Sequence, residues 1–167
     1  MRTLTVAEAT YIAGYLDGEG SITVRKEKRV ANTRGWRLNP VVAMFNTHLA
    51  SLEWVQETCG TGSLRQGATK GKNWKPHYKQ VWGLWFNANA ARDLLPQLLP
   101  YLKIKREAAE LLLEYLGFVT QGERMTPEQE IRAWEIAGAI QKRRTRVTIV
   151  SNLDRELAER FGGTAGV

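Results

Sequence analysis

The sequence is poor in the residues that form disulfides and clustered metal sites. It has one cysteine, Cys59, and two histidines among 167 residues. One cysteine cannot make an internal disulfide, and no clustered pocket of histidines and carboxylates supports a metal enzyme acting on small molecules. No segment approaches the roughly 18 consecutive apolar residues of a membrane span, and the opening MRTLTVAEAT has no signal-peptide core. We therefore expect a soluble, intracellular protein with no membrane partner.

Acidic residues are scarce in one part of the chain, residues 21–80. That stretch contains eleven Lys and Arg, three Glu and no Asp, a net charge of +8, whereas the remainder of the chain carries −1. A localised positive field attracts a polyanion, because neutralising its phosphates releases condensed counterions. The alternative is a solvated face that only aids solubility. The asymmetry favours a nucleic-acid partner.

The spacing of apolar residues predicts one α+β domain over residues 1–167, with no dividing linker. Thr5 and Glu8 have the spacing of a capping box at a helix start. Pro40 suggests that the second strand is an edge strand or carries a bulge. The predicted strands cover residues 21–29, 37–46, 63–67 and 77–86, and the predicted helices cover residues 6–17, 47–60, 87–102, 105–118, 127–144 and about 151–161.

The stretch YIAGYLDGEG, residues 11–20, places carboxylates where a helix ends. Ala13 and Gly14 are small enough to let another helix approach closely. Asp17 and Glu19 lie at the negative end of the helix dipole, which is unfavourable unless a positive group compensates. A hard divalent cation accepts carboxylate and carbonyl oxygens as ligands. The alternative is an ordinary polar helix stop followed by a turn.

Residues 12–20, IAGYLDGEG, resemble the signature of the LAGLIDADG homing endonucleases. Gly18 stands at the second small position and Glu19 at the catalytic acidic position. The predicted element order is similar to the αββαββα core of that family, here about residues 5–121, whose curved antiparallel sheet binds DNA. Extra C-terminal helices then follow over about residues 122–162. The resemblance implies a fold of this type.

The resemblance also implies the catalytic groups. Glu19, assisted by the carbonyl of Gly18, would hold Mg²⁺ or another divalent cation such as Mn²⁺, whereas Ca²⁺ could bind without supporting cleavage. Residues 102–105, LKIK, are similar to the segment whose second lysine, here Lys105, enters the active site. Asn46 matches the polar residue that positions a water in related enzymes, although gaps could shift this match to Phe45 or Thr47.

DNA contacts are expected from the polar faces of the strands, their connecting loop and the C-terminal part. A sheet can lie in the major groove, where Arg pairs with guanine and Asn or Gln with adenine. The residues expected to contact DNA are Thr23, Arg25, Glu27, Arg29, Arg37, Asn39, Arg65, Lys70, Lys72, Lys75, Lys79, Gln80, Lys142 and Arg144.

The sequence contains one copy of the signature. Ile136-Ala137-Gly138 repeats its first half, but Gln141 and Arg143 then replace the acidic residues, which indicates a packing site. Single-motif members of the family act as homodimers, which implies a long pseudo-palindromic double-stranded DNA target cut at both strands, as in intron homing. The alternative function is a non-cleaving nucleic-acid-binding protein of the same fold, a maturase or transcription regulator. The expected dimer interface comprises Ile12, Ala13, Gly14, Tyr15 and Leu16.

Overall fold

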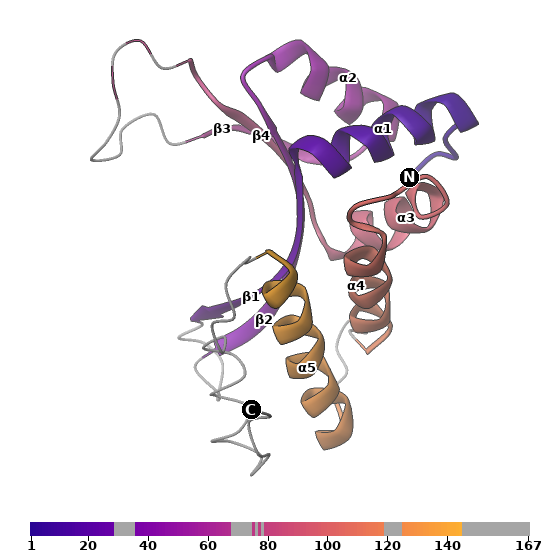
Figure 1. Cartoon of the computed structure of the whole chain (residues 1–167), viewed down its shortest axis with the longest axis vertical. Helices are drawn as coiled ribbons and strands as arrows, with labels where there is room; N and C mark the ends of the chain where they lie inside the picture. Colours follow the sequence, from indigo (N-terminus) through magenta and orange to yellow (C-terminus); the bar gives the residue numbers. More distant parts are fainter. Residues whose placement is uncertain (29–35, 68–74, 76, 78, 119–124, 145–167) are drawn as a thin grey trace. The chain divides into compact units, whose positions relative to one another are not determined.

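The computed structural model describes residues 1–28, 36–67, 75, 77, 79–118 and 125–144 (Figure 1). The predicted α+β class and element order are confirmed over this part of the chain, whereas the predicted helix at about residues 151–161 lies outside it. The elements are α1 (Val6–Glu19), β1 (Gly20–Lys28), β2 (Trp36–Asn46), α2 (Leu49–Cys59), β3 (Ser63–Gln66), β4 (Trp82–Phe86), α3 (Ala88–Leu98), α4 (Arg106–Phe118) and α5 (Pro127–Arg144).

The strands form one sheet in the order β1-β2-β4-β3. β4 runs antiparallel to both of its neighbours, and Leu84 is opposite Met44 on one side and Leu64 on the other. β2 is therefore an inner strand, and the expectation of an edge position from Pro40 is wrong. The pairing of β2 with β4 begins only at Val42, so the missing amide hydrogen of Pro40 interrupts none of these paired positions.

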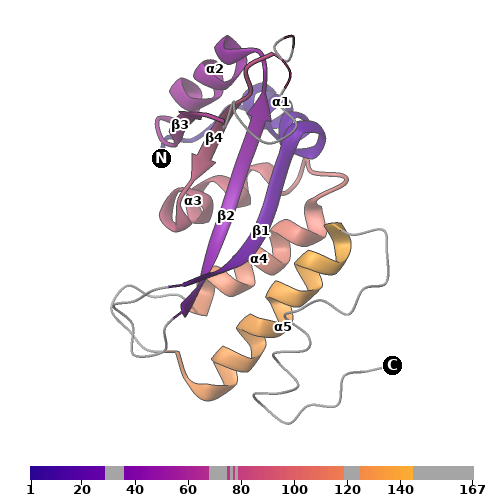
Figure 2. The same ribbon diagram turned by 90° about the vertical axis from the view of Figure 1, so that its left-hand side faces the viewer.

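The chain forms two compact units, and the first comprises Met1–Ser21 and Val41–Arg106. In this unit α1 contacts α3, and α2 contacts β3 and β4 (Figures 1 and 2). Its core consists of aliphatic and aromatic side chains with almost no exposed surface, among them Ile12, Leu52, Leu84, Phe86 and Leu94. Burial of these side chains at roughly 1.5–3 kcal/mol each is the main stabilising contribution.

The second compact unit comprises Ile22–Pro40 and Glu107–Val167. In it, α4 and α5 lie beside the outer parts of β1 and β2 (Figure 2). The hydroxyl of Tyr115 on α4 donates to the carbonyl of Leu38 at 2.9 Å, and the ammonium of Lys26 lies 5.4 Å from the ring centroid of the buried Trp134 on α5. The Ile136-Ala137-Gly138 segment is buried in α5, as expected of a packing site.

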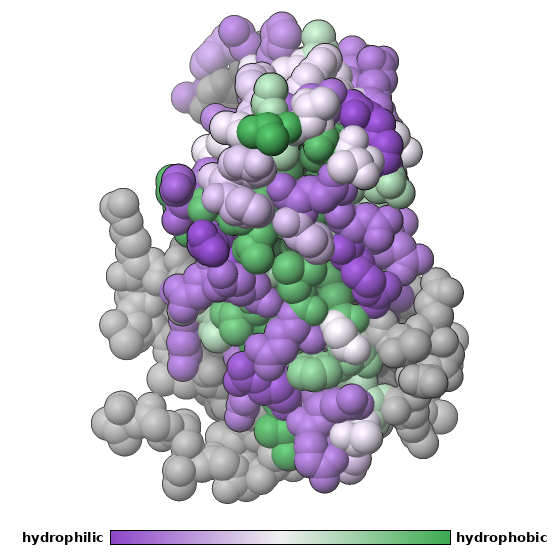
Figure 3. Space-filling view, turned by 90° about the vertical axis from the view of Figure 1, so that its right-hand side faces the viewer, coloured by the Kyte–Doolittle hydropathy of each residue, from purple (hydrophilic) through white to green (hydrophobic). Residues whose placement is uncertain are grey.

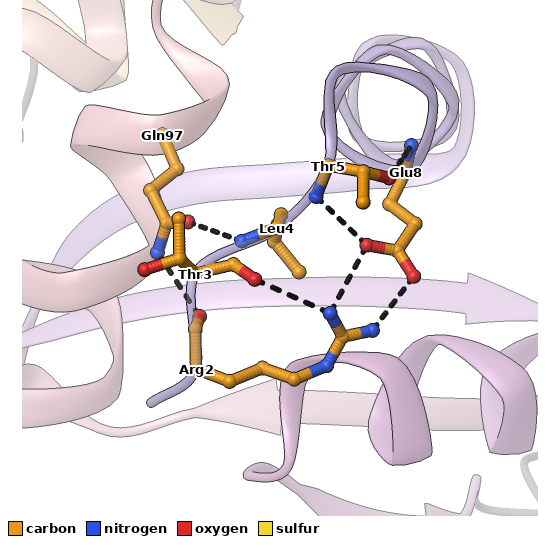
Figure 4. Close-up of polar contacts among 6 residues, drawn as sticks. All are labelled: Arg2, Thr3, Leu4, Thr5, Glu8 and Gln97. Atoms are coloured by element: carbon orange, nitrogen blue, oxygen red, sulfur yellow. Dashed lines mark hydrogen bonds and ion pairs between the residues drawn. The ribbon is translucent and has the colours of Figure 1, made fainter.

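The start of α1 is fixed by a polar cluster (Figure 4). Thr5 and Glu8 form the predicted capping box, in which the Thr5 amide donates to the Glu8 carboxylate at 2.8 Å. Arg2 donates to both oxygens of that carboxylate at 2.7 and 3.1 Å, and the Leu4 amide donates to Gln97 of α3 at 2.8 Å. The Arg2 hydrogen bonds, followed by the Thr5 amide, lower the pKa of Glu8 from 4.5 to about 2.

None of the helices in the described residues combines the length and the apolar character needed to cross a membrane. Hydrophilic side chains are spread over the face shown in Figure 3, with smaller hydrophobic groups between them.

The Glu8 cluster makes part of the stability dependent on pH. Because the pKa of Glu8 is lower in the folded state, its contribution is fully present above pH 4.5 and is lost as the pH falls through about 2. We expect Glu8→Gln to lower the free energy of unfolding at pH 7 and to flatten its decline between pH 4.5 and 2, measured by urea denaturation. Glu53→Gln removes an exposed carboxylate on α2. Its free energy of unfolding should decline between pH 4.5 and 2 as steeply as that of the wild type. An unchanged slope in Glu8→Gln would contradict this role.

Candidate functional site

The candidate site lies at the C-terminal end of α1, where the helix passes directly into β1. Glu19 is the last helical residue, and its side chain is exposed, as is Gly18. Gly20 follows with an extended backbone, and a Cβ there would lie 2.5 Å from the carbonyl oxygen of Leu16. The absence of a side chain at Gly20 therefore lets the strand leave the helix without a loop, with Glu19 at the junction.

Asp17 has a role that the sequence did not reveal. Its carboxylate accepts hydrogen bonds from three consecutive backbone amides, those of Lys103 at 2.7 Å, Ile104 at 3.1 Å and Lys105 at 2.8 Å. The residue is 9% exposed. The buried charge is thus compensated by amide hydrogens that precede α4, and Asp17 fixes residues 103–105 to the end of α1.

Lys105 is held against the same helix end. Its ammonium donates to the backbone carbonyl of Asp17, one of the last carbonyls of α1. Burial lowers the pKa of Lys105, and the nearby negative charges of Asp17 and Glu19 oppose that shift. The positive group needed at this helix end therefore includes Lys105 itself, which places a cation near the exposed carboxylate of Glu19.

This arrangement provides hard oxygen ligands and a cation, but few ligands in total. The carboxylate of Glu19 and the carbonyl of Gly18 are of the type that Mg²⁺ and Ca²⁺ prefer. No group of three or more His, Cys, Asp or Glu that could hold a metal occurs in the part of the chain that the structure describes. A complete coordination shell here would need oxygens from water, a substrate or a second chain.

Asn46, expected to position a water, ends β2 and caps the following turn. Its side-chain oxygen accepts from the His48 amide at 2.9 Å, and His48 immediately precedes α2. The neighbouring alternatives differ in exposure, since Phe45 is half-buried and packs edge-on against Trp85, whereas Thr47 is exposed.

The outer parts of β1 and β2 present a polar face. Lys26 of β1 lies against Trp134 of α5, and the Leu38 side chain of β2 is buried. Arg25, next to Lys26, and Arg37 and Asn39, which flank Leu38, therefore lie on the opposite side of the strands. Arg25 is exposed, whereas Glu27, Arg37 and Asn39 are half-buried.

Thr23 does not fit the expected accessible face. It is fully buried, and its hydroxyl has no hydrogen-bond partner among the described residues. Ile22 and Val24 on either side of it are buried too. Both faces of β1 are therefore covered at this point, where a strict alternation of buried and open positions had been expected. Thr23 cannot contact DNA in this conformation.

The second strand pair and the C-terminal part are described only partly. Arg65 is exposed, donates to Ser63 at 3.0 Å and has its guanidinium 5.8 Å from the ring centroid of Trp85. The Gln80 amide group donates to the carbonyls of Gly67 and Val81 and accepts from Gln66, so it holds the two strands together. Lys75, Lys79 and Lys142 are exposed, whereas Arg29, Lys70, Lys72 and the side chain of Arg144 lie outside the described residues.

Only part of the expected dimer interface is exposed on the surface of the chain. Ile12, Ala13 and Leu16 have no exposed surface, because this side of α1 packs into the core of its own chain. Their assignment to a surface between two chains was therefore wrong. Gly14 is exposed, and a Cβ built there would meet nothing within 4 Å, whereas Tyr15 is half-buried and bonded to Ser51 at 2.9 Å.

An aromatic cluster that the sequence analysis missed lies beside Gly14. Tyr11 is 53% exposed and Trp54 of α2 is 41% exposed, and their ring centroids are 5.1 Å apart in an edge-to-face arrangement. Tyr15 adds a third ring 6.2 Å from Tyr11. The spacing of Tyr11, Gly14 and Gly18 along α1 could have indicated this outer stripe, since residues three and four apart share a helix face.

Structural comparison relates this chain to homing endonucleases. I-CvuI in complex with DNA superposes with a TM-score of 0.70 and 20% sequence identity, covering 95% of this chain and 96% of that one. The archaeal intron-encoded homing endonuclease I-Vdi141I, also bound to DNA, gives 0.72 and 19%, covering 91% and 93%. The LAGLIDADG meganuclease I-CpaMI bound to DNA gives 0.67 and 17%, covering 92% of this chain but 48% of that one.

No family model and no curated protein matches the sequence. At these identities the structural likeness shows the fold. The chain has the α+β fold with a four-stranded sheet of LAGLIDADG endonuclease structures, as the resemblance of residues 12–20 implied.

The hydrogen bonds of Asp17 predict a large effect of a small substitution. Asp17→Asn should lower the free energy of unfolding by about 2–3 kcal/mol, because it removes the charge and places an amide group against backbone donors. Urea denaturation at pH 7 measures this loss. Asp93→Asn alters an exposed ion pair with the terminal amine and should cost less than about 1 kcal/mol. Equal losses of unfolding free energy in Asp17→Asn and Asp93→Asn would show that the three hydrogen bonds of Asp17 stabilise the fold no more than an exposed ion pair does.

Proposed function

We propose that this protein is a site-specific, divalent-metal-dependent DNA endonuclease that acts as a homodimer on a long pseudo-palindromic target. The observation that carries the proposal is the end of α1. There an exposed carboxylate, Glu19, lies within the field of a partly buried cation, Lys105, which Asp17 holds in place. A protein that only binds DNA has no physical need for a carboxylate exposed toward phosphates.

The ligand set fits a hard cation, for which Glu19 and the Gly18 carbonyl provide oxygens. When bound, such an ion lowers the pKa of an attacking water and stabilises negative charge on a phosphate. The Glu19 side chain is exposed at the tip of α1, where an ion from solvent can reach it. Lys105 keeps two further ammonium hydrogens beyond the one donated to Asp17, and these stabilise charge developing on the phosphate.

The charge distribution supports DNA as the substrate. The excess of +8 within residues 21–80 includes Arg25, Arg37, Arg65, Lys75 and Lys79, none of which is fully buried. I-CvuI and I-Vdi141I, which are homing endonucleases bound to DNA, match this chain along nearly their whole length. Sequence readout then falls to the polar faces of the strands, and the lysines near the chain reversal between β3 and β4 bind phosphates.

The small ligand set and the lengths of the matching structures support a homodimer. The chain matches nearly all of I-CvuI but only about half of I-CpaMI, so one copy corresponds to half of the longer protein. We place the dimer contact on the exposed stripe of α1 at Gly14 and Gly18, next to the aromatic cluster of Tyr11 and Trp54. A twofold axis there brings two Glu19 residues together.

The second candidate is a non-cleaving nucleic-acid-binding protein on the same fold. It is favoured by one observation, the hydrogen bond that engages the side-chain oxygen of Asn46, the group expected to position a water. Cleavage and binding are separable, because the basic strands do not depend on Glu19.

Glu19 is the residue whose substitution tests the proposed cleavage. The purified protein is incubated with Mg²⁺ and a library of duplexes with a long random centre, and the ends produced are sequenced. The wild type should yield ends converging on one near-palindromic site, and Glu19→Gln should lower cleavage by at least about a thousandfold while retaining that duplex, because the carboxylate charge is lost and the fold is not. Cleavage by Glu19→Gln would refute the ligand role. Retention of duplex or RNA without ends by both proteins would support the binding function.

Gly14 is the residue whose substitution tests the proposed dimer. Gly14→Leu should convert the dimer to a monomer in sedimentation velocity, because a large side chain prevents close approach of two α1 helices while meeting nothing in its own chain. Gly117→Leu on α4 is the matched control, since it is also helical, exposed and open, and should remain a dimer. Sedimentation of Gly14→Leu as an unchanged dimer would rule out this interface.

A further inference from the structure

Three polar side chains form a hydrogen-bonded cluster on the open face of β1 and β2. One carboxylate oxygen of Glu27 accepts from Nε and Nη2 of Arg37 at 3.3 and 3.0 Å, and the other accepts from Nδ2 of Asn39 at 2.8 Å. The cluster therefore joins the one acidic residue of this strand pair to two of the residues expected to read bases.

The cluster contributes little to stability. The Arg37 and Glu27 side chains are 40% and 39% exposed, and ion pairs this accessible to water are screened and weak. Its physical effect is on orientation. A free arginine side chain samples many rotamers, whereas a guanidinium bonded along its Nε–Nη2 edge has its plane and direction fixed.

The fixed orientation leaves the groups that read bases available. With the Nε–Nη2 edge directed at Glu27, the end of the guanidinium formed by Nη1 and Nη2 remains as a donor pair, which matches O6 and N7 of guanine. Asn39 gives one amide hydrogen to Glu27 and keeps the second hydrogen and its oxygen, which match N7 and N6 of adenine.

The carboxylate also acts against the wrong contact. Unpaired arginines on a DNA-facing surface bind phosphates, which carry no sequence information. A negative charge within hydrogen-bond distance of Arg37 repels the full charge of a phosphate more strongly than the partial charges of a base edge.

We propose that Glu27 is a specificity-determining positioning residue, whose carboxylate orients Arg37 and Asn39 toward base edges and keeps phosphates away from them. This inference rests on the proposed DNA-binding function. Under this inference Glu27 raises the discrimination between DNA sequences and lowers the total affinity for DNA.

The test compares base preferences. Wild type, Glu27→Gln, Arg37→Lys, Asn39→Ala and the double variant Glu27→Gln/Arg37→Lys are each equilibrated with the randomised duplex library, with Ca²⁺ in place of Mg²⁺, and bound duplexes are sequenced. Glu27→Gln should reduce discrimination by about tenfold at the base positions that Arg37→Lys also affects, and strengthen binding to non-selected duplex. In the Arg37→Lys background, Glu27→Gln should change discrimination at the arginine-dependent positions little further, because Glu27 acts there through Arg37.

Glu114→Gln is the matched control. Glu114 pairs with Arg132 at 2.7 Å, with side-chain exposures of 38% and 45%, and this pair joins α4 to α5 rather than lying on the open strand face. Glu114→Gln removes the same charge as Glu27→Gln and should leave the base preferences unchanged.

Three outcomes overturn the inference. An unchanged preference profile in Glu27→Gln would show that the cluster does not position base readers. A loss confined to a base that Arg37→Lys and Asn39→Ala leave unaffected would show that Glu27 reads a base itself. If the wild type enriches no duplex, both the proposed function and the inference fail. In the first two outcomes, by contrast, the wild type shows a clear base preference, so the inference about Glu27 fails while the proposed function stands.

Discussion

The candidate site depends on one buried carboxylate bonded to three backbone amides. Asp17 joins the end of α1 to residues 103–105, 86 or more positions later in the chain. That link sets the place of Lys105, and through it the field around Glu19. A charge at low exposure is stable only while every donor around it stays in place. The geometry of the site thus depends on the three hydrogen bonds of Asp17, which link the two segments without a disulfide.

Local patterns predicted most of the secondary structure because its ends follow local rules. Thr5 and Glu8 marked the start of α1, and Gly60, with a positive φ of 64°, caps α2 at the end of the helix predicted over residues 47–60. The predicted strand over residues 77–86 is shorter in the structure, Trp82–Phe86, because both neighbouring strands end opposite Trp82, β2 at Asn46 and β3 at Gln66. The extent of a strand is set by its partner, and the residues of one strand alone do not contain that information.

The candidate site was predicted in part. The signature located Glu19 and Gly18, and residues 102–105 located Lys105, but the sequence did not predict that Asp17 and Lys105 contact each other at the helix end. For Asp17 the compensating groups are backbone amides, which have no sequence signal. The hydrophobic pattern of α1 also shows only that one face is buried. It does not tell whether Ile12, Ala13 and Leu16 meet their own chain or a second one, and the structure assigns them to their own core.

The direct passage from α1 into β1 restricts how this protein can change during evolution. No loop separates Glu19 from the strand, and alternate residues of a strand face opposite sides. Inserting or deleting a single residue at Gly20 would turn Arg25 and Glu27 to the covered side and bring Lys26 to the open one. The number of residues between the Glu19 carboxylate and the open face of β1 is consequently fixed. β1 can therefore change through substitutions, while changes of length have to accumulate elsewhere in the chain.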